Sequence, residues 1–279
     1  MNREYKRVLT VQDISCFGQC SLTVALPIIS ACGVETCILP SAVLSTHTGG
    51  FTGFTFRDLT DDIPAIAAHW NKEGIKFDAI YTGYLGSQKQ IDMVKGLFTT
   101  LGKEGFVKLV DPAMADNGKL YTGFDTDYAH AMAELCAEAD IVLPNITEAC
   151  FMTGFEYAEE YGEEYIQTLL QLLAAYGMNN VVLTGVSYEK DTTGVVVKCG
   201  DRVKYYKHRR VPTSSHGTGD VFASAFTGAL MNGFDEYDSA RIAADFTLEC
   251  IERTVGDEDH KYGVKFELAL PELIKMLGK

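Results

Sequence analysis

Short β-branched runs alternate with longer amphipathic stretches along most of the 279 residues. The runs that we expect to be strands span residues 7–12, 35–39, 78–82, 107–110, 141–143 and 181–184. The stretches between them that we expect to be helices span residues 21–31, 59–73, 88–101, 127–138 and 163–176. Strands that are joined through helices pair in parallel, because each helix returns the chain to the same edge of the sheet. The alternation predicts an α/β fold, a doubly wound, mostly parallel sheet with helices on both faces.

This alternation ends after Gly185. Residues 193–199 and 203–208 are two strand-like runs on either side of Gly200 and Asp201, a pair typical of hairpin turns. A polar loop at residues 212–215 follows, and the remaining predicted helices span residues 221–231, 239–252 and 266–277. The chain contains no repeat, no low-complexity segment and no long linker. We therefore expect residues 1–279 to form a single domain.

The composition limits the partners that the chain can have. Its net charge is −14 and its isoelectric point is about 4.8. Nucleic acids and anionic membranes both attract clustered Lys and Arg, so we expect neither as a partner. Residues 1–7 are mostly polar or charged, and no run of about 18 apolar residues occurs, so we expect no signal peptide and no membrane span. The eight scattered cysteines fit reduced thiols, and we expect a cytoplasmic location.

The segment Gly217-Thr218-Gly219-Asp220 stands where a loop becomes a helix. Its glycines allow a tight turn and let a ligand approach the backbone without meeting a Cβ atom. The free N–H groups of the first helical turn and the helix dipole favour an anion there, such as a phosphoryl group during transfer. Asp220 is placed to accept the proton of an attacking hydroxyl group. An ordinary turn explains the tetrapeptide equally well, because short glycine motifs often occur by chance.

Six further segments precede this motif in order, at the expected strand ends. They are Thr10-Val11-Gln12-Asp13, Ser45-Thr46-His47-Thr48-Gly49, Thr82-Gly83-Tyr84, Asp111-Pro112, Pro144-Asn145-Ile146-Thr147-Glu148 and Leu183-Thr184-Gly185. Over residues 8–254 the chain thereby resembles the pyridoxal kinase family of the ribokinase superfamily. The resemblance implies a ribokinase-like fold with a late β-hairpin. It also implies an enzyme of vitamin B6 salvage, which phosphorylates the 5′-hydroxymethyl group of pyridoxal, pyridoxamine or pyridoxine with ATP.

The resemblance implies which residues contact the vitamer. His47 and Thr48 match the segment that lies over the pyridoxal ring, and Tyr84 matches the aromatic residue that stacks on it. Asp13 stands at a contact to the ring where many relatives have Ser. Asp220 matches the base that deprotonates the hydroxymethyl group.

Further matches imply the nucleotide and metal sites. The residues that match positions at the nucleotide are Asp111, Tyr121, Asn145, Glu148 and Thr184, with Gly217, Thr218 and Gly219 as the anion hole. Asp111 and Glu148 are the expected Mg²⁺ ligands, directly or through water, because Mg²⁺ usually takes only one or two carboxylates. K⁺ is a further candidate cofactor, and the family resemblance implies a homodimer.

Several of these residues also have purely structural readings. Open α/β sheets bind ligands at the carboxyl ends of their strands, and most of the matched residues fall there. Asn145 and Glu148 are three residues apart at the start of a helical stretch, so they can face one ligand shell, or they can form a capping box. Tyr84 can be a core residue. His47 can be a hydrogen-bonded structural histidine.

Two positions leave the identity of the substrate undecided. Asp13 puts a negative charge near the ring, which would favour a cationic ring nitrogen or an amine such as that of pyridoxamine. His216 before the glycines is typical of hydroxymethylpyrimidine kinases, a branch that usually has Cys at the position of Asp220. The alternatives are therefore a hydroxymethylpyrimidine kinase or another small-molecule kinase of the superfamily, and a non-catalytic protein that binds the vitamer. A nicotinamide-dependent oxidoreductase is disfavoured, because residues 14–20 contain one glycine where its fingerprint has three.

Overall fold

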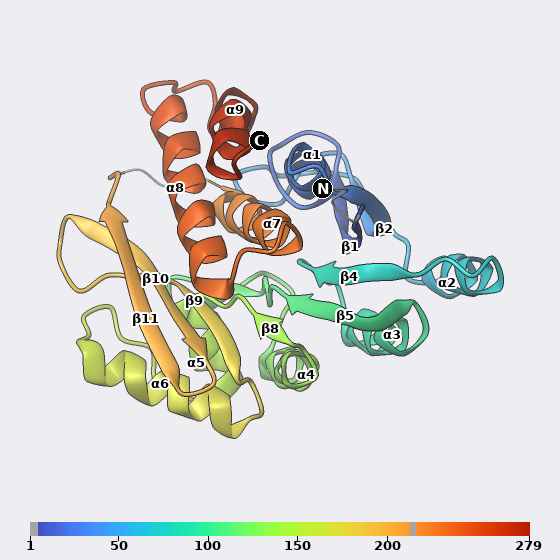
Figure 1. The fold of residues 1–279 in the computed structure, drawn as a ribbon, viewed down its shortest axis with the longest axis horizontal. Helices are drawn as coiled ribbons and strands as arrows, with labels where there is room; N and C mark the ends of the chain where they lie inside the picture. Colours follow the sequence, from blue (N-terminus) through green and yellow to red (C-terminus); the bar gives the residue numbers. More distant parts are fainter. Residues whose placement is uncertain (1–4, 213–215) are drawn as a thin grey trace.

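The computed structural model describes residues 5–212 and 216–279, and one large sheet runs through this part of the chain (Figure 1). In spatial order its strands are β11 (Arg202–Arg209), β10 (Thr192–Cys199), β9 (Asn180–Val186), β8 (Ile141–Val142), β5 (Gly102–Val110), β4 (Phe77–Thr82), β1 (Arg7–Ser15), β2 (Glu35–Leu44) and β3 (Phe56–Asp58). Strands β9 to β2 pair in parallel, whereas β10, β11 and β3 are antiparallel. This is the predicted mostly parallel sheet with a late hairpin. Because the sheet is continuous, we propose that residues 1–279 form a single domain.

Helices cover both faces of the sheet (Figure 1). One face carries α1 (Leu22–Ala31), α7 (Thr218–Met231), α8 (Glu236–Thr254) and α9 (Phe266–Met276). The other carries α2 (Ile63–Lys72), α3 (Gln88–Thr100), α4 (Thr126–Ala137), α5 (Ile146–Thr153) and α6 (Glu163–Ala175). The central strands are buried on both sides, which explains their nearly continuous apolar sequences. Two hydrophobic cores result, one on each face of the sheet.

Some elements extend beyond their predicted ends. β1 continues to Ser15 and β2 to Leu44. The predicted strands end earlier, because polar residues that are buried in the structure are typical of strand ends in a sequence. Asp13 therefore lies within β1 and not in the loop after it. α1 begins at Leu22 and runs through Pro27, where we expected a late start or a kink.

Other elements were not predicted at all. They are the edge strand β3 and the small hairpin of β6 (Ala115–Asp116) and β7 (Lys119–Leu120). α7 begins at Thr218, three residues before the predicted start, and this places Asp220 in its first turn. Most of the predicted polar loop at residues 212–215 lies outside the described residues. Among the helices of the described ranges, none combines the length and the apolar character needed to cross a bilayer.

Candidate active site

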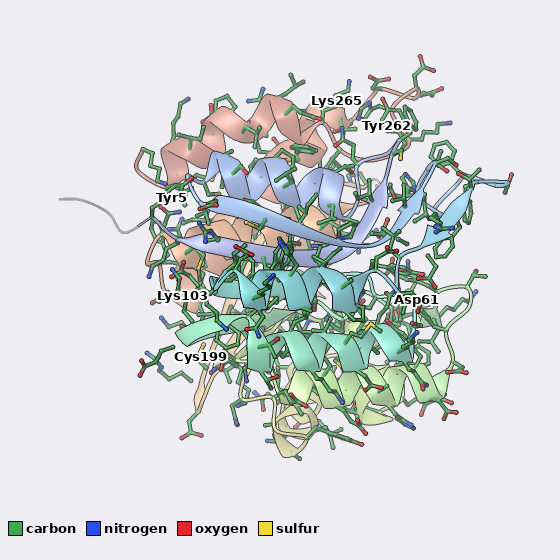
Figure 2. The ribbon with its side chains drawn as sticks, turned by 90° about the vertical axis from the view of Figure 1, so that its right-hand side faces the viewer. Tyr5, Asp61, Lys103, Cys199, Tyr262 and Lys265 are labelled. Carbon is green, nitrogen blue, oxygen red and sulfur yellow. The ribbon has the colours of Figure 1, made fainter. Side chains whose placement is uncertain are left out.

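The predicted site residues gather at the carboxyl ends of the parallel strands. Tyr84 follows β4, Asp111 follows β5, and the backbone N–H of Asp111 donates to the carbonyl of Thr82 over 2.9 Å. Asn145 follows β8 and forms a parallel bridge with Thr184 of β9. Figure 2 shows this end of the molecule at the right, near the labels of Asp61 and Tyr262, with the strand starts near Tyr5 and Lys103 at the left. The fold thus places one edge of the sheet beside the N-terminus of α7.

The N-terminus of α7 is open to a ligand. No side chain within the described ranges caps this helix, so its first N–H groups are free to bind an anion. Gly217 adopts φ 75°, and a Cβ atom there would lie 1.8 Å from the carbonyl oxygen of Gln19, so only glycine fits. A Cβ atom on Gly219 would meet no atom within 4 Å, so the backbone at this position faces open space.

Two carboxylates, those of Asp13 and Asp220, interact electrostatically near this helix end. Asp13 is 5 % exposed and accepts a hydrogen bond of 2.9 Å from the hydroxyl of Ser15. Desolvation by burial, together with the negative charge of Asp13, raises the pKa of Asp220 to about 7. Burial also raises the pKa of Asp13. Hydrogen bonds from the side chains of Ser21 and Ser15 lower that pKa, but their effect is smaller than that of burial. At neutral pH the Asp220 carboxyl group is therefore poised to accept or release a proton.

Ser21 is a site residue that the sequence did not reveal. Its backbone N–H hydrogen bonds to Asp220 and lowers the pKa of that carboxyl group, while its side chain bonds to Asp13. It is buried and has φ 53° and ψ −132°, a conformation that residues with a side chain rarely adopt. In the sequence it reads as an ordinary N-cap of α1, although its side chain makes no cap hydrogen bond.

Asn145 and Glu148 form the capping box that their spacing allowed. Glu148 accepts the backbone N–H groups of Asn145 over 2.8 Å and of Met114 over 3.2 Å, one on each carboxylate oxygen. Asn145 accepts the N–H of Glu148 over 2.9 Å and donates to the carbonyl of Ala115 over 2.8 Å. These bonds hold the β6–β7 hairpin against the start of α5. Glu148 also accepts the backbone N–H of Ala115, so three of the roughly four acceptor sites of its carboxylate are used. The remaining one keeps a role at a metal through water compatible with the cap.

The predicted nucleotide end of the site is strongly acidic. Burial raises the pKa of Glu148 to about 7, and burial followed by the charges of Glu148 and Asp220 raises the pKa of Asp111. The ion pairs found among the described residues include none of these three carboxylates. Closely spaced carboxylates without a basic partner fit a hard divalent cation such as Mg²⁺.

The described residues contain no group of three or more His, Cys, Asp or Glu side chains that could hold a metal ion. A Mg²⁺ ion would therefore be held by few protein ligands and by water, which is its usual coordination in proteins. Tyr121 is 42 % exposed. Its pKa is raised, first by desolvation of the hydroxyl group and then by nearby negative charges that include those of Glu148 and Asp111.

At the predicted ring end, the structure supports structural roles for two residues. The ring of His47 is buried, its Nε2 lies 3.0 Å from the carbonyl oxygen of Tyr262, and burial lowers its pKa. Tyr84 is half-buried and packs against Phe124 with ring centroids 5.5 Å apart. Thr48 is exposed and open to a ligand. Binding roles for these residues stay predictions.

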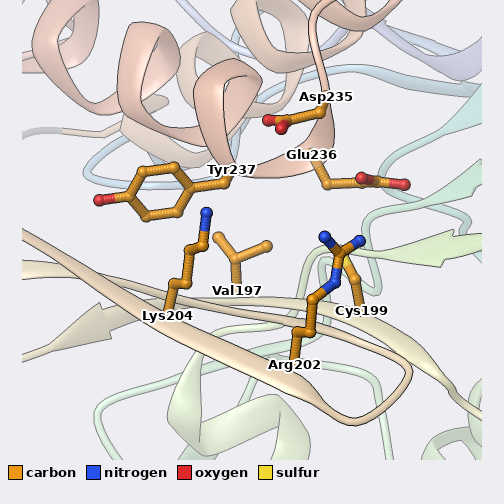
Figure 3. Close-up of a pocket in the computed structure, with 7 residues that line it drawn as sticks. All are labelled: Val197, Cys199, Arg202, Lys204, Asp235, Glu236 and Tyr237. Carbon is orange, nitrogen blue, oxygen red and sulfur yellow. The ribbon is translucent and has the colours of Figure 1, made fainter.

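The cavities that lie elsewhere are not part of this site. Figure 3 shows a small one of about 20 Å³, which holds little more than one water, between the β10–β11 hairpin and α8. Its residue Cys199 appears in Figure 2 at the strand-start end, far from Tyr262. A larger cavity of about 320 Å³ lies beside Tyr5, Gly33 and Asn232, also at that end.

The chain is similar to known proteins over most of its length. The chain matches the family model described as phosphomethylpyrimidine kinase over residues 26–264. It is 25 % identical to the hydroxymethylpyrimidine/phosphomethylpyrimidine kinase of Bacillus subtilis, over 89 % of this chain and 83 % of that protein. It is 26 % identical to the pyridoxine/pyridoxal/pyridoxamine kinase of Bordetella bronchiseptica, over 88 % of this chain and 89 % of that protein.

Solved structures give the same result. A Bacteroides thetaiotaomicron protein assigned to the phosphomethylpyrimidine kinases, crystallised with pyridoxal, superposes with a TM-score of 0.90 at 38 % identity, over 97 % of this chain and 96 % of that chain. The pyridoxal kinase of Lactobacillus plantarum superposes with a TM-score of 0.89 at 30 % identity, over 98 % of both chains.

The α/β sheet, with carboxylates at its strand ends beside an uncapped helix N-terminus, defines a kinase of the ribokinase class. Within that class, the chain belongs to the family of pyridoxal and phosphomethylpyrimidine kinases in the ribokinase superfamily. This confirms the resemblance and the fold that the sequence motifs predicted.

Proposed function

We propose that this kinase transfers the γ-phosphate of ATP to the 5′-hydroxymethyl group of a vitamin B6 vitamer. One observation carries the proposal: Asp220 lies in the first turn of α7, whose N–H groups are open to a ligand, within electrostatic reach of Asp13. The proposed base, anion site and ring contact would thus lie near one another. The pyridoxal-bound Bacteroides structure and the Bordetella vitamer kinase support the same substrate class.

Asp220 would act as the general base in an in-line transfer. Its carboxylate takes the hydroxyl proton while the oxygen attacks the γ-phosphorus and ADP leaves. A carboxyl group with a pKa of about 7 is a stronger base than an ordinary aspartate and is still ionised in about half of the molecules at pH 7. The N–H groups of Gly217, Thr218 and Gly219 would stabilise the charge on the transferred phosphoryl group.

The nucleotide would lie across the strand ends. Asp111 and Glu148 would hold Mg²⁺, directly or through water, and Tyr121, Asn145 and Thr184 would border the phosphates. Bound magnesium would supply positive charge that neutralises the phosphate oxygens. The β10–β11 hairpin would help to exclude water from the nucleotide. K⁺ as a second cofactor and the homodimer stay expectations from the family resemblance.

Asp13 would favour a vitamer that carries a positive charge. It is buried and forms no ion pair with a Lys or Arg side chain of the described residues, so a cationic substrate group would be attracted to it. We expect Asp13→Ser to lower kcat/KM for pyridoxamine more than for pyridoxal or pyridoxine. Equal losses for all three vitamers would contradict this role.

Hydroxymethylpyrimidine phosphorylation is the second candidate function. The matching family model and the Bacillus subtilis relative favour it. Measuring ATP consumption with pyridoxal, pyridoxine, pyridoxamine and hydroxymethylpyrimidine separates the two candidates. We expect the highest kcat/KM with a vitamer; a clear preference for hydroxymethylpyrimidine would establish the second candidate, and consumption with none of the four would contradict both.

A further inference from the structure

His216 makes contacts that the proposed chemistry does not use. Its ring rests on the loop of residues 45–53, named here the substrate loop, where a Cβ atom on Gly49 would lie 2.7 Å from both Cε1 and Nδ1 of His216. Gly50 also approaches the ring, because a Cβ atom there would lie 3.8 Å from Nε2. The backbone of Gly49 does not have the positive φ that demands glycine. A side chain at this position would therefore have to displace the imidazole of His216.

His47 links the substrate loop to the rest of the protein. The rings of His47 and His216 lie with centroids 5.4 Å apart and planes at 47°. On its other side, His47 lies 3.0 Å from the carbonyl oxygen of Tyr262, and a Cβ atom on Gly18 would be 2.1 Å from its Cδ2. The substrate loop is thus fixed to the loops at residues 16–20 and 260–263 through His47. The substrate loop also contacts His216, which directly precedes Gly217, the first residue of the anion hole.

We propose that His216 is a positioning residue that couples the substrate loop to the anion hole, so that a ligand bound at either one strengthens binding at the other. The inference rests on the proposed function, because it assigns the alcohol to the substrate loop and the phosphates to Gly217–Gly219. A ring in contact with backbone cannot be compressed, so a shift of one loop moves the other. A ligand that orders one loop also reduces the entropy lost when the second ligand orders its own loop.

The direct test measures the dissociation constant of pyridoxal by calorimetry, with and without a non-hydrolysable ATP analogue and Mg²⁺. For the wild type we expect the nucleotide to tighten pyridoxal binding by a factor of about five or more, in the usual range of couplings between sites. For His216→Ala we expect a factor near one. The inference would be overturned if the nucleotide changed the pyridoxal dissociation constant of the wild type by a factor near one, or changed that of His216→Ala as much as that of the wild type. The proposed function is judged separately, because ATP-dependent phosphorylation of pyridoxal by the wild type would still support it.

A double-mutant cycle tests the contact itself. Gly49→Ala should lower kcat/KM for pyridoxal by about tenfold to 10²-fold, because its new Cβ atom displaces His216 and misplaces the loop. In the His216→Ala background the same change should cost little, because the imidazole is gone. Gly96→Ala, on α3 with no atom within 4 Å, is the matched control and should leave kcat/KM unchanged. If the two substitutions instead lower kcat/KM additively, Gly49 does not act through His216.

Discussion

At the scale of single residues, the site is a set of buried carboxylates that form no ion pair with a Lys or Arg side chain of the described ranges. Asp13, Asp111 and Glu148 are each less than a tenth exposed, and burial is the largest cause of the raised pKa of each. Such groups disfavour their charged forms and attract protons or cations. This property suits a site that must accept a proton at one end and a metal nucleotide at the other.

The pH dependence of activity should reveal how Asp13 acts on Asp220. The negative charge of Asp13 raises the pKa of Asp220, so the neutral side chain in Asp13→Asn should lower it. We expect the acid limb of the kcat/KM profile for pyridoxine to lie near pH 7 in the wild type and at lower pH in Asp13→Asn. Glu134→Gln, an exposed carboxylate on α4, is the control. An acid limb that stayed in place in Asp13→Asn would contradict this interaction.

At the scale of elements, two helix N-termini at the same sheet edge differ in their caps. Asn145 and Glu148 close the start of α5, and their bonds fix the β6–β7 hairpin. The start of α7 has a left-handed glycine in place of a side-chain cap. The first helix end therefore supports the structure, and the second is available to a phosphate.

Two glycines of α7 should respond differently to alanine. Gly217→Ala should lower both the melting temperature and the activity, because of its positive φ and the nearby carbonyl of Gln19. Gly219→Ala should leave the melting temperature nearly unchanged, because its Cβ atom meets no protein atom, but should raise KM for ATP by narrowing the anion hole. Scanning calorimetry and steady-state kinetics check both variants. Full activity with unchanged KM in Gly219→Ala would mean that phosphate does not approach this backbone.

The elements also show what the sequence could predict. The alternation of strands and helices predicted the sheet and its late hairpin, because strands buried on both faces have a clear apolar pattern. The C-terminal end of β1 was missed, because Asp13 and Ser15 are polar residues inside a buried strand. Ser21 and the contact of His216 with Gly49 were missed as well, because both depend on loops that only the tertiary structure brings together.

At the scale of the whole molecule, the topology gathers the acidic groups at one edge of the sheet. The parallel strands all end at this edge, and the helix that carries Asp220 starts there. The chain has a net charge of −14, and none of the ion pairs found in the described part of the chain involves Asp13, Asp111, Glu148 or Asp220. A bound divalent cation would relieve this repulsion, and its effect should depend on pH.

We expect MgCl₂ to raise the melting temperature more at pH 8 than at pH 6. Burial raises the pKa values of Glu148 and Asp220 to about 7, above those of the unfolded chain. Between the unfolded-state pKa and the folded-state pKa of each group, the folded protein therefore binds more protons than the unfolded chain. As the pH rises through this range to about 7, the two groups increasingly destabilise the metal-free protein. Above that pH the ionised carboxylates can bind Mg²⁺. Differential scanning calorimetry measures the shift; an equal or larger shift at pH 6 would contradict the predicted metal site.

We propose that Asp220 is the base in the transfer of phosphate from ATP to a vitamer. The most direct test is the rate of pyridoxal 5′-phosphate formation by the wild type and by Asp220→Asn, which keeps the size of the side chain. We expect kcat to fall by a factor on the order of 10²–10⁴ in the variant, with an unchanged melting profile and retained nucleotide binding. A variant rate within about twofold of the wild type, far less than the usual contribution of a general base, would contradict it.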